Sequence, residues 1–386
     1  MNLEDLVLEN IHNIMSEAER FVQEGRERHY YDQSRKNPFD HLSDNMFIRL
    51  FRLNKQLVRE LLEKLNPFLT PPRRIHDLDK ETKVLVALKF FASGSYQMDI
   101  GANVWVGVSQ SSVSRSIEEV SAALNSNEIF NEYVKFPSTI RECEILRENF
   151  NQKFEFPGVI GVIDCTHVAI VPPSGDREEY LYVNRKKYHS LNVQLICSSN
   201  LRILNVIARY PGATHDSFIW NQSRCQYILR NLYLRTRRSF YLLGDSGYPL
   251  RPWLLTPFDG NPEPGTPQYE FNQHLKKTRC LIERCNGVLK MRFRCLLKHR
   301  VLHYTPEKAG KLINACVVLH NICVENNMPE PDPEIEDDLL DLDYGIYAIG
   351  NENDTGGAGG MARVNPELVE GRRIRNIVMN YFQNVN

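Results

Sequence analysis

The chain has 386 residues, of which 42% are apolar and 25% are charged, and its formal net charge is −1 at pH 7. This composition is typical of a soluble globular protein, and the length suits two domains or one large domain. Because the net charge is close to zero, it excludes a basic surface that covers the whole protein. Any surface that binds nucleic acid must therefore be local.

The nine cysteines are an odd number and contain no CxxC pair. This usage favours reduced thiols in an intracellular protein over a disulfide framework or a zinc site. The first residues, MNLEDLVLENIHNIM, interleave acidic with apolar side chains and do not resemble a signal peptide. No apolar run approaches the roughly 20 residues that span a bilayer. We therefore expect no membrane association and a location in the nucleus and the cytoplasm.

Residues 1–150 are predicted to form an all-α domain. Apolar residues recur at helical spacing near the N-terminus and again in DNMFIRLFRLNKQLVRELLEKLNPFL, where Asp44 is a candidate N-cap and Pro67 marks the expected end. The following segment, ETKVLVALKFFASG, predicts another helix that Gly94 closes.

Residues from about 94 to 125 have the pattern of a helix-turn-helix. A short helix is expected around 98–104, and Ser109 is a suitable N-cap for a second helix over 110–124. In such a motif, the start of the second helix contacts base edges and phosphates. The candidate DNA-binding side chains on its outer face are Gln110, Ser112 and Arg115. A capped core helix with a polar outer face explains the same pattern, and both interpretations stay open.

From Gly158 onward the pattern changes from helical to strand-rich. GVIGVIDCTHVAIV is typical of a strand that is buried on both faces, and two further β-rich runs, 190–199 and 202–212, predict a hairpin. Another buried strand is expected over 239–248, followed by a helix over about 269–289 and an apolar helix over 312–327. Residues 151–327 are therefore predicted to form a mixed α/β domain.

Three acidic residues, Asp164, Asp245 and Glu283, are expected in buried strands or in a basic helix. An ionised carboxylate in such a place costs folding free energy. An ionised carboxylate in a buried strand requires a positive or hydrogen-bonding partner. Hard divalent cations meet this requirement with few carboxylates, and two such ions can activate a water and stabilise a leaving oxygen. Asp216, in PGATHDSF, is a fourth candidate, and its alternative role is a helix N-cap. For Glu283 taken alone, an ion pair with Arg279 within the helix is the simpler explanation.

Two basic segments are candidates for phosphate contacts. Arg185, Lys186 and Lys187 lie between two strands in YVNRKKYH, where a solvated charged hairpin is the alternative. Residues 275–300 hold nine basic side chains against one acid, which predicts a local DNA track. Its candidate DNA contacts are Arg279, Lys290, Arg292 and Arg294.

Two histidines are interpreted as structural. Alternation along the strand places His167 on the opposite face from Asp164, so we expect it to pack or form hydrogen bonds instead of binding a metal. His320, in VVLHNIC, is expected to be a satisfied core histidine.

Six motifs, taken in order and spacing, resemble those of the PIF/Harbinger transposases and the harbinger transposase-derived nucleases, which are DDE superfamily endonucleases. They are GVIGVIDCTHVAI, YVNRKKYHSLNVQLIC, ARYPGATHDSF, LLGDSGYPLRPWLLTP, IERCNGVLKMRFRCL and ACVVLHNIC. The resemblance implies an RNase H-like mixed sheet with flanking helices over 151–327. It also implies a nuclease site that uses Mg²⁺ or Mn²⁺, with Asp164, Asp245 and Glu283 as the DDE triad and Asp216 as an additional acidic position.

The implied reaction is hydrolysis of DNA phosphodiester bonds by an activated water, with strand transfer as a further activity in a full transposase. Members of the family work with a separate Myb/SANT-like DNA-binding protein, and a homodimer is a further expectation. If such a partner reads the DNA, the helix-turn-helix serves protein contacts instead. A catalytically silent DNA-binding or regulatory protein on the same fold is the alternative function. A small-molecule phosphatase is disfavoured by the basic segment over 275–300.

The C-terminal part of the chain is not explained by the resemblance. Residues 328–363 are acidic and then glycine-rich and are predicted to form a linker. Residues 364–386 predict a terminal helix, with Asn365 as its cap and Pro366 in its first turn.

Overall fold

A computed structural model of the chain describes residues 36–74, 77–173, 178–331 and 365–385. The helix predicted near the N-terminus and most of the predicted linker lie outside these residues. The chain divides into two compact units, Met1–Ala123 and Leu124–Asn386, each of which is described by itself.

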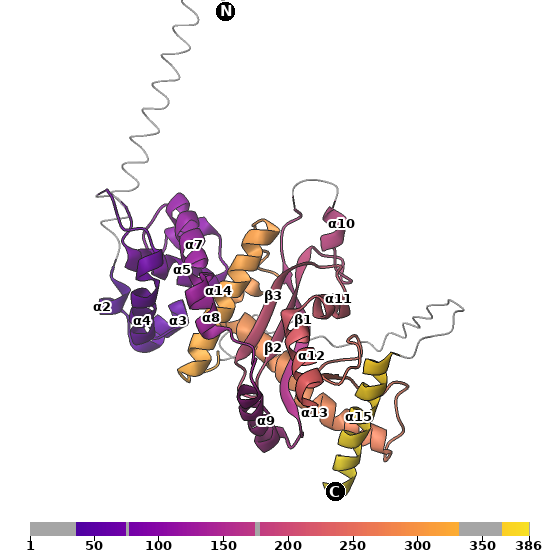
Figure 1. Cartoon of the computed structure of the whole chain (residues 1–386). Helices are drawn as coiled ribbons and strands as arrows, with labels where there is room; N and C mark the ends of the chain where they lie inside the picture. The colour runs from indigo at the N-terminus through magenta and orange to yellow at the C-terminus, as the bar shows by residue number, and fades with distance from the viewer. Residues whose placement is uncertain (1–35, 75–76, 174–177, 332–364, 386) are drawn as a thin grey trace, which may run out of the picture. The chain divides into compact units, whose positions relative to one another are not determined.

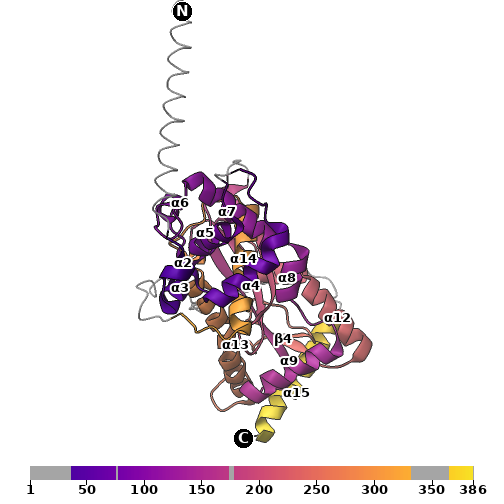
Figure 2. The ribbon, with the colours of Figure 1, turned by 90° about the vertical axis from the view of Figure 1, so that its left-hand side faces the viewer.

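The described part of the first unit is helical (Figure 2). Its elements are α2 (Pro38–His41), α3 (Asp44–Phe51), α4 (Lys55–Leu65), η1 (Asn66–Phe68), α5 (Lys80–Ser93), α6 (Gln97–Gly101) and α7 (Gln110–Leu124). Helices α3 and α4 both pack against α5, and Phe47, Phe51 and Phe91 are fully buried between them. Apolar burial therefore organises this unit.

The ends of α3 and α5 show how local chemistry sets helix boundaries. Ser43, and not Asp44 as predicted, is the N-cap of α3, because its side chain accepts a hydrogen bond from the Met46 amide. Asp44 is instead the first helical residue, where its negative charge favours the helix dipole. Gly94 ends α5 as predicted, with a left-handed φ of 63°.

Helices α6 and α7 lie within the segment for which a helix-turn-helix is predicted. Gly107 has a φ of 52° between them, and Ser109 Oγ accepts a hydrogen bond from the Ser112 amide at 3.4 Å. The apolar face of α7, including Val113 and Ile117, is fully buried, whereas Gln110 and Arg115 are exposed and Ser112 is half-buried. DNA contact by this face stays a prediction.

The second unit contains a five-stranded mixed sheet (Figure 1). Its strands are β1 (Val159–Ala169), β2 (Ser190–Cys197), β3 (Ile203–Pro211), β4 (Tyr241–Leu243) and β5 (Leu254–Leu255). The order across the sheet is β3-β2-β1-β4-β5, where β1, β2 and β3 are antiparallel and β4 and β5 are parallel to β1. This mixed sheet with flanking helices is consistent with the RNase H-like arrangement that the sequence predicts.

The helices of the second unit bury the central strand. They are α8 (Asn127–Tyr133), α9 (Ile140–Phe154), α10 (Glu179–Tyr182), α11 (Asp216–Asn221), α12 (Arg224–Thr236), α13 (Pro267–Arg292), η2 (Arg294–Leu296), α14 (Pro306–Glu325) and α15 (Pro366–Val385). Helices α9 and α13 pack on β1, and α14 packs on β3. The predicted domain boundary at 150/151 therefore differs from the observed division, because α8 and α9 pack against elements of the second unit.

The C-terminal helix α15 packs against α13 within the second unit (Figure 2). The Phe382 ring stacks on His274 with a centroid distance of 4.0 Å and meets Phe156 edge-on. Arg375 donates hydrogen bonds to the Thr256 and Pro257 carbonyls. Helix α15 thus extends the core around the first half of α13. Within the described ranges, no helix combines the length and the apolar character needed to cross a bilayer.

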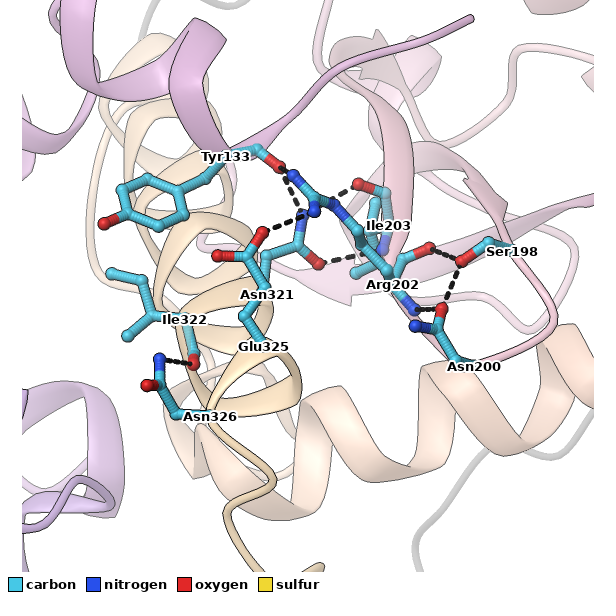
Figure 3. A network of polar contacts seen from close by, with 9 residues as sticks. All are labelled: Tyr133, Ser198, Asn200, Arg202, Ile203, Asn321, Ile322, Glu325 and Asn326. Atoms are coloured by element: carbon cyan, nitrogen blue, oxygen red, sulfur yellow. Dashed lines mark hydrogen bonds and ion pairs between the residues drawn. The ribbon is translucent and has the colours of Figure 1, made fainter. Parts of the chain in front are cut away.

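A buried asparagine fastens α14 to the sheet (Figure 3). Asn321 is fully buried, and its Nδ2 donates to the carbonyls of Tyr133 at 2.9 Å and Ile203 at 2.8 Å. Its Oδ1 accepts from the Ile203 amide at 2.8 Å. The preceding residue, His320, places Nε2 2.9 Å from the carbonyl of Leu201, which adopts a left-handed φ of 69°. His320 is therefore a core histidine, as predicted, but only Nε2 is satisfied, since its buried Nδ1 has no hydrogen-bond partner among the described residues.

Replacement of Asn321 by alanine should destabilise the second unit by roughly 3 kcal/mol, because the buried Ile203 amide and carbonyl would be left without this partner. The matched control is Asn326→Ala, an exposed residue at the end of the same helix. That control should change the free energy of unfolding by less than about 0.5 kcal/mol. Equal effects of the two substitutions in urea denaturation would contradict this role for Asn321.

Candidate carboxylate site

Strand pairing places Asp164 and Asp245 at the same level of the sheet. Strands β1 and β4 are parallel, and Val162 pairs with Leu243. Leu243 follows Val162 by 81 positions, and Asp245 follows Asp164 by the same 81 positions. Asp245 lies two residues beyond the end of β4, so its backbone leaves the sheet just where Asp164 sits on the neighbouring strand. The register thus brings the first two predicted catalytic residues together.

Asp164 is 4% exposed, and both of its carboxylate oxygens accept hydrogen bonds. Oδ1 accepts from the Cys165 amide at 2.9 Å, and Oδ2 accepts from Arg279 at 3.1 Å. Burial raises the pKa of Asp164 to about 7; the Arg279 charge opposes this rise, whereas the charges of Asp245 and Asp216 add to it. Burial therefore outweighs the Arg279 charge and disfavours the ionised form of Asp164.

Asp245 shares this electrostatic environment. Burial raises its pKa, and the charge of Asp216 raises it further. The charges of Arg279 and Arg185 and a 2.9 Å hydrogen bond from the Gly247 amide act in the opposite direction. The pKa of Asp245 thus depends both on the charge of Asp216 and on the basic loop that contains Arg185.

Glu283 joins the site through Arg279, which lies one turn earlier on α13. Arg279 donates to Glu283 Oε1 at 2.9 Å and also to Asp164, so one guanidinium bridges the helix and the strand. The side chain of Glu283 is 31% exposed, whereas that of Arg279 is 10% exposed. The ion pair within the helix that the sequence suggested is present, but it is half of a three-residue bridge.

Asp216 lies close enough to Asp164 and Asp245 for its charge to raise the pKa of both. It is the first residue of α11, and His215 occupies the N-cap position. The alternative role of Asp216 as a helix N-cap is therefore wrong. Its Oδ1 instead accepts a hydrogen bond from Asn192 at 2.8 Å, which fixes the carboxylate against β2.

The donor chemistry of these carboxylates fits a hard divalent cation. Carboxylate oxygens are the ligands that Mg²⁺ prefers, and Asp164 and Asp245 are buried acids whose charged forms a cation would stabilise. In the described parts of the chain, however, no group of three or more His, Cys, Asp or Glu side chains is placed to hold one ion together. A positive group, the guanidinium of Arg279, lies among the carboxylates instead.

A basic loop lies near the carboxylates. Arg185, Lys186 and Lys187 are exposed, and the buried Asn184 holds their backbone because its Oδ1 accepts from the Lys186 amide at 2.9 Å. Asn184 is fixed in turn by a 2.9 Å hydrogen bond to Ser190 at the start of β2. The Arg185 charge lowers the pKa of Asp245, so this loop adds positive potential next to the acidic site.

The four candidate DNA contacts within residues 275–300 are not exposed, whereas Lys276, Lys277, Arg284 and Lys298 of the same segment are. Arg279, Lys290 and Arg292 are buried, and Arg294 is half-buried. Lys290 donates to the His167 carbonyl at 2.8 Å, and Arg292 donates to the Pro329 carbonyl at 3.1 Å. Burial lowers the pKa of Lys290 to about 8. A count along the sequence could not separate these internal side chains from exposed ones.

Two residues that shape the site, Asn184 and Tyr248, were not singled out from the sequence. For Arg279 the sequence offered a DNA contact and an ion pair with Glu283, but not the contact with Asp164. The Tyr248 hydroxyl lies 3.3 Å from Sγ of Cys165, the residue directly after Asp164. The spacing of Arg279 and Glu283, four residues apart on one helix, was the sequence signal for the bridge.

His167 forms a hydrogen bond, as predicted, and it lies close enough to Asp216 for that charge to oppose the lowering of its pKa by burial. Its Nδ1 lies 3.0 Å from Ser190 Oγ, and burial lowers its pKa from 6.5 to about 4. Between these pH values the unfolded chain binds a proton that the folded chain does not bind. His167 therefore contributes stability above pH 6.5 that is lost as the pH falls to about 4.

The His167→Gln variant should lose less stability than the wild type between pH 7 and pH 4, by up to about 3 kcal/mol. The measurement is urea denaturation across this pH range in EDTA, with the exposed His303→Gln as the control. Parallel pH profiles for His167→Gln and the wild type would show that a neutral buried His167 does not contribute.

Comparison with known proteins supports a nuclease family. Residues 163–321 match the model of the DDE superfamily endonuclease family. The nuclease-named protein HARBI1 of Homo sapiens is 36% identical over 292 residues, which cover 75% of this chain and 80% of HARBI1. HARBI1 of Rattus norvegicus is 34% identical over 78% of this chain and 87% of its own length.

A plant protein shows a more distant likeness. "Protein ALP1-like" of Arabidopsis thaliana is 27% identical over 69% of this chain and 66% of its own length. No solved structure matches the chain. The matched region contains the acidic residues described above, and the likeness to HARBI1 extends over most of both proteins. The chain therefore belongs to the DDE superfamily endonucleases, in the family of the harbinger transposase-derived nuclease HARBI1.

Proposed function

We propose that the protein is a divalent-metal-dependent DNA endonuclease of the Harbinger type, built on an RNase H-like sheet. The observation that carries the proposal is the register of β1 and β4, which puts Asp164 and Asp245 at one level of the sheet. The bridge through Arg279 adds Glu283 to the same group. The match to a DDE superfamily endonuclease model supports the same conclusion.

In this proposal, Asp164, Asp245 and Glu283 hold Mg²⁺ or Mn²⁺, and Asp216 adds negative charge next to them. When bound, such ions activate a water as the nucleophile and stabilise the leaving oxygen of a phosphodiester. The protein contributes a buried, acidic centre that fixes the position of the ligands. The loop of Arg185, Lys186 and Lys187 holds the DNA backbone beside it through phosphate contacts.

The proposal includes several features of the first unit and of the assembly. The pair α6 and α7 acts as a helix-turn-helix, with Gln110, Ser112 and Arg115 facing DNA or a protein partner. A Myb/SANT-like protein supplies sequence recognition, a second copy of the chain completes a homodimer, and the protein acts in the nucleus and the cytoplasm. Strand transfer is a further activity of the same site.

The second candidate function is a DNA-binding or regulatory protein that does not cut. The specific observation in its favour is the guanidinium of Arg279, which lies among the carboxylates where a catalytic cation would be needed. One relative also has a name from chromatin biology, "Antagonist of like heterochromatin protein 1" of Arabidopsis thaliana. It is 27% identical over 64% of this chain and 63% of its own length.

Cleavage of DNA in Mg²⁺ or Mn²⁺ separates the two functions. The wild type should nick or cut plasmid DNA, and Asp245→Asn and Glu283→Gln should each lower the rate roughly 100-fold or more, because each removes an anionic ligand of the metal ions that the reaction requires. Asp259→Asn, an exposed acid in a loop, should cut like the wild type. If the wild type binds DNA but does not cut it, the nuclease proposal is wrong and the DNA-binding or regulatory function remains.

The loop of Arg185, Lys186 and Lys187 is tested by the salt dependence of DNA binding in EDTA. Changing all three to glutamine should reduce the slope of log Kobs against log salt by about 0.9 for each phosphate that these side chains neutralise, or up to about 2.7. The control changes two exposed arginines on α12, Arg224 and Arg235, to glutamine. If the loop variant keeps the wild-type slope, this loop does not contact DNA.

A further inference from the structure

Arg279 contacts two of the predicted catalytic carboxylates at once. One terminal nitrogen donates to Asp164 Oδ2 at 3.1 Å, and the other donates to Glu283 Oε1 at 2.9 Å. The Arg279 side chain is only 10% exposed, and that of Asp164 is 5% exposed. An ion pair this deeply buried is screened far less than a surface pair, so its charges act strongly on each other.

The guanidinium supplies charge that the buried acids require. Removing a carboxylate from water is costly unless a positive or hydrogen-bonding partner meets it. The Arg279 charge lowers the pKa of both Asp164 and Asp245, against the effects of burial and of neighbouring acids. Arg279 therefore stabilises the folded protein when no metal ion is bound.

The contacts of Asp164 make a metal ion and Arg279 compete. Its Oδ1 accepts a hydrogen bond from the Cys165 amide, and its Oδ2 accepts one from Arg279. A cation that approaches Oδ2 meets a second positive group within hydrogen-bond distance of the same atom, and the repulsion is strong in a buried site. A divalent ion must therefore displace the guanidinium from Asp164 or bind with reduced affinity.

The position of Arg279 on α13 suits this exchange. It is one helical turn before Glu283, so the pair within the helix holds the guanidinium whether or not the contact with Asp164 is made. The contact between strand and helix can thus open without unfolding α13. A surface arginine on the same helix, Arg284, has no such role, because its partner is Glu330 at 2.8 Å and its side chain is 59% exposed.

We propose that Arg279 is a built-in counter-cation, which holds Asp164 and Glu283 together in the metal-free protein and must release Asp164 before a divalent cation binds there. This inference rests on the proposed function, because it concerns the same carboxylates. It replaces the assignment of Arg279 as a DNA contact. Arg279 lowers the affinity for metal and raises the stability of the metal-free protein, two effects of opposite sign.

The test compares the full chain with Arg279→Gln, Arg279→Lys and Arg284→Gln. Binding of Mn²⁺ is measured without DNA, from the electron paramagnetic resonance signal of free Mn²⁺ at constant ionic strength. Thermal unfolding is followed in EDTA and in Mn²⁺. Arg279→Gln should unfold at a lower temperature in EDTA and yet bind Mn²⁺ about tenfold more tightly or better.

Arg279→Lys keeps the charge but cannot bridge two carboxylates with a planar fork, so its affinity for Mn²⁺ should lie between those of the wild type and Arg279→Gln. Arg284→Gln should match the wild type in both measurements. If Arg279→Gln does not fold, the Arg279→Lys variant still tests the direction of the change.

The outcomes separate this inference from the proposed function. Tighter Mn²⁺ binding by Arg279→Gln supports it, including the case in which only the variant binds Mn²⁺. A wild type that binds Mn²⁺ with an affinity that Arg279→Gln leaves unchanged or weakens would overturn it, because Arg279 would then position the ligands or have no effect, and the metal-dependent function would remain. If neither the wild type nor any of the variants binds Mn²⁺, both proposals are overturned.

Discussion

The ion pair between Asp164 and Arg279 is the contact on which the carboxylate site of the second unit depends. A carboxylate at the centre of a buried strand is tolerated only with compensating charge, and the structure supplies that charge from α13. The same guanidinium also binds Glu283, one turn further along α13, so it links the strand to the helix. The parallel pairing of β1 with β4 then brings Asp245 to the same level of the sheet as Asp164.

In this unit, buried and exposed charged side chains have different roles. Asp164 and Asp245 lie at one level of the sheet, Asp216 acts on both through its charge, and Arg279 links Glu283 to Asp164. The basic side chains within residues 275–300 take separate roles. Arg279 compensates the acids, Lys290 and Arg292 bind backbone carbonyls of the protein, and the basic residues of the loop after α10 are exposed. A near-neutral chain can in this way carry an acidic centre beside a basic surface.

Much of the sheet could be predicted from the sequence, since β-branched runs and the turn between β2 and β3 are local signals. The carboxylates were also predictable, because Asp164 interrupts an apolar strand and Asp245 ends another. The partner of Asp164 was not, because the pairing of Asp164 with Arg279 depends on how α13 crosses β1, and no local pattern encodes that crossing. For the same reason the burial of Lys290 could not be read from a basic helix.

The boundary between the two units also could not be predicted from local sequence patterns. Helices α8 and α9 continue the all-helical pattern that precedes them, which favours a boundary at 150, yet they pack on α14 and β1. Similarly, Ser43 and Asp44 are both good N-cap residues, and only the backbone conformation decides between them.

The most direct test of the central claim is a crystal structure of the protein with Mn²⁺, collected at a wavelength that gives anomalous signal from manganese. The account predicts an anomalous peak at the oxygens of Asp164 and Asp245, with the Arg279 guanidinium no longer bonded to Asp164. A structure from crystals equilibrated in saturating Mn²⁺ that shows no peak at these residues, or a peak with the bond between Asp164 and Arg279 intact, would contradict it.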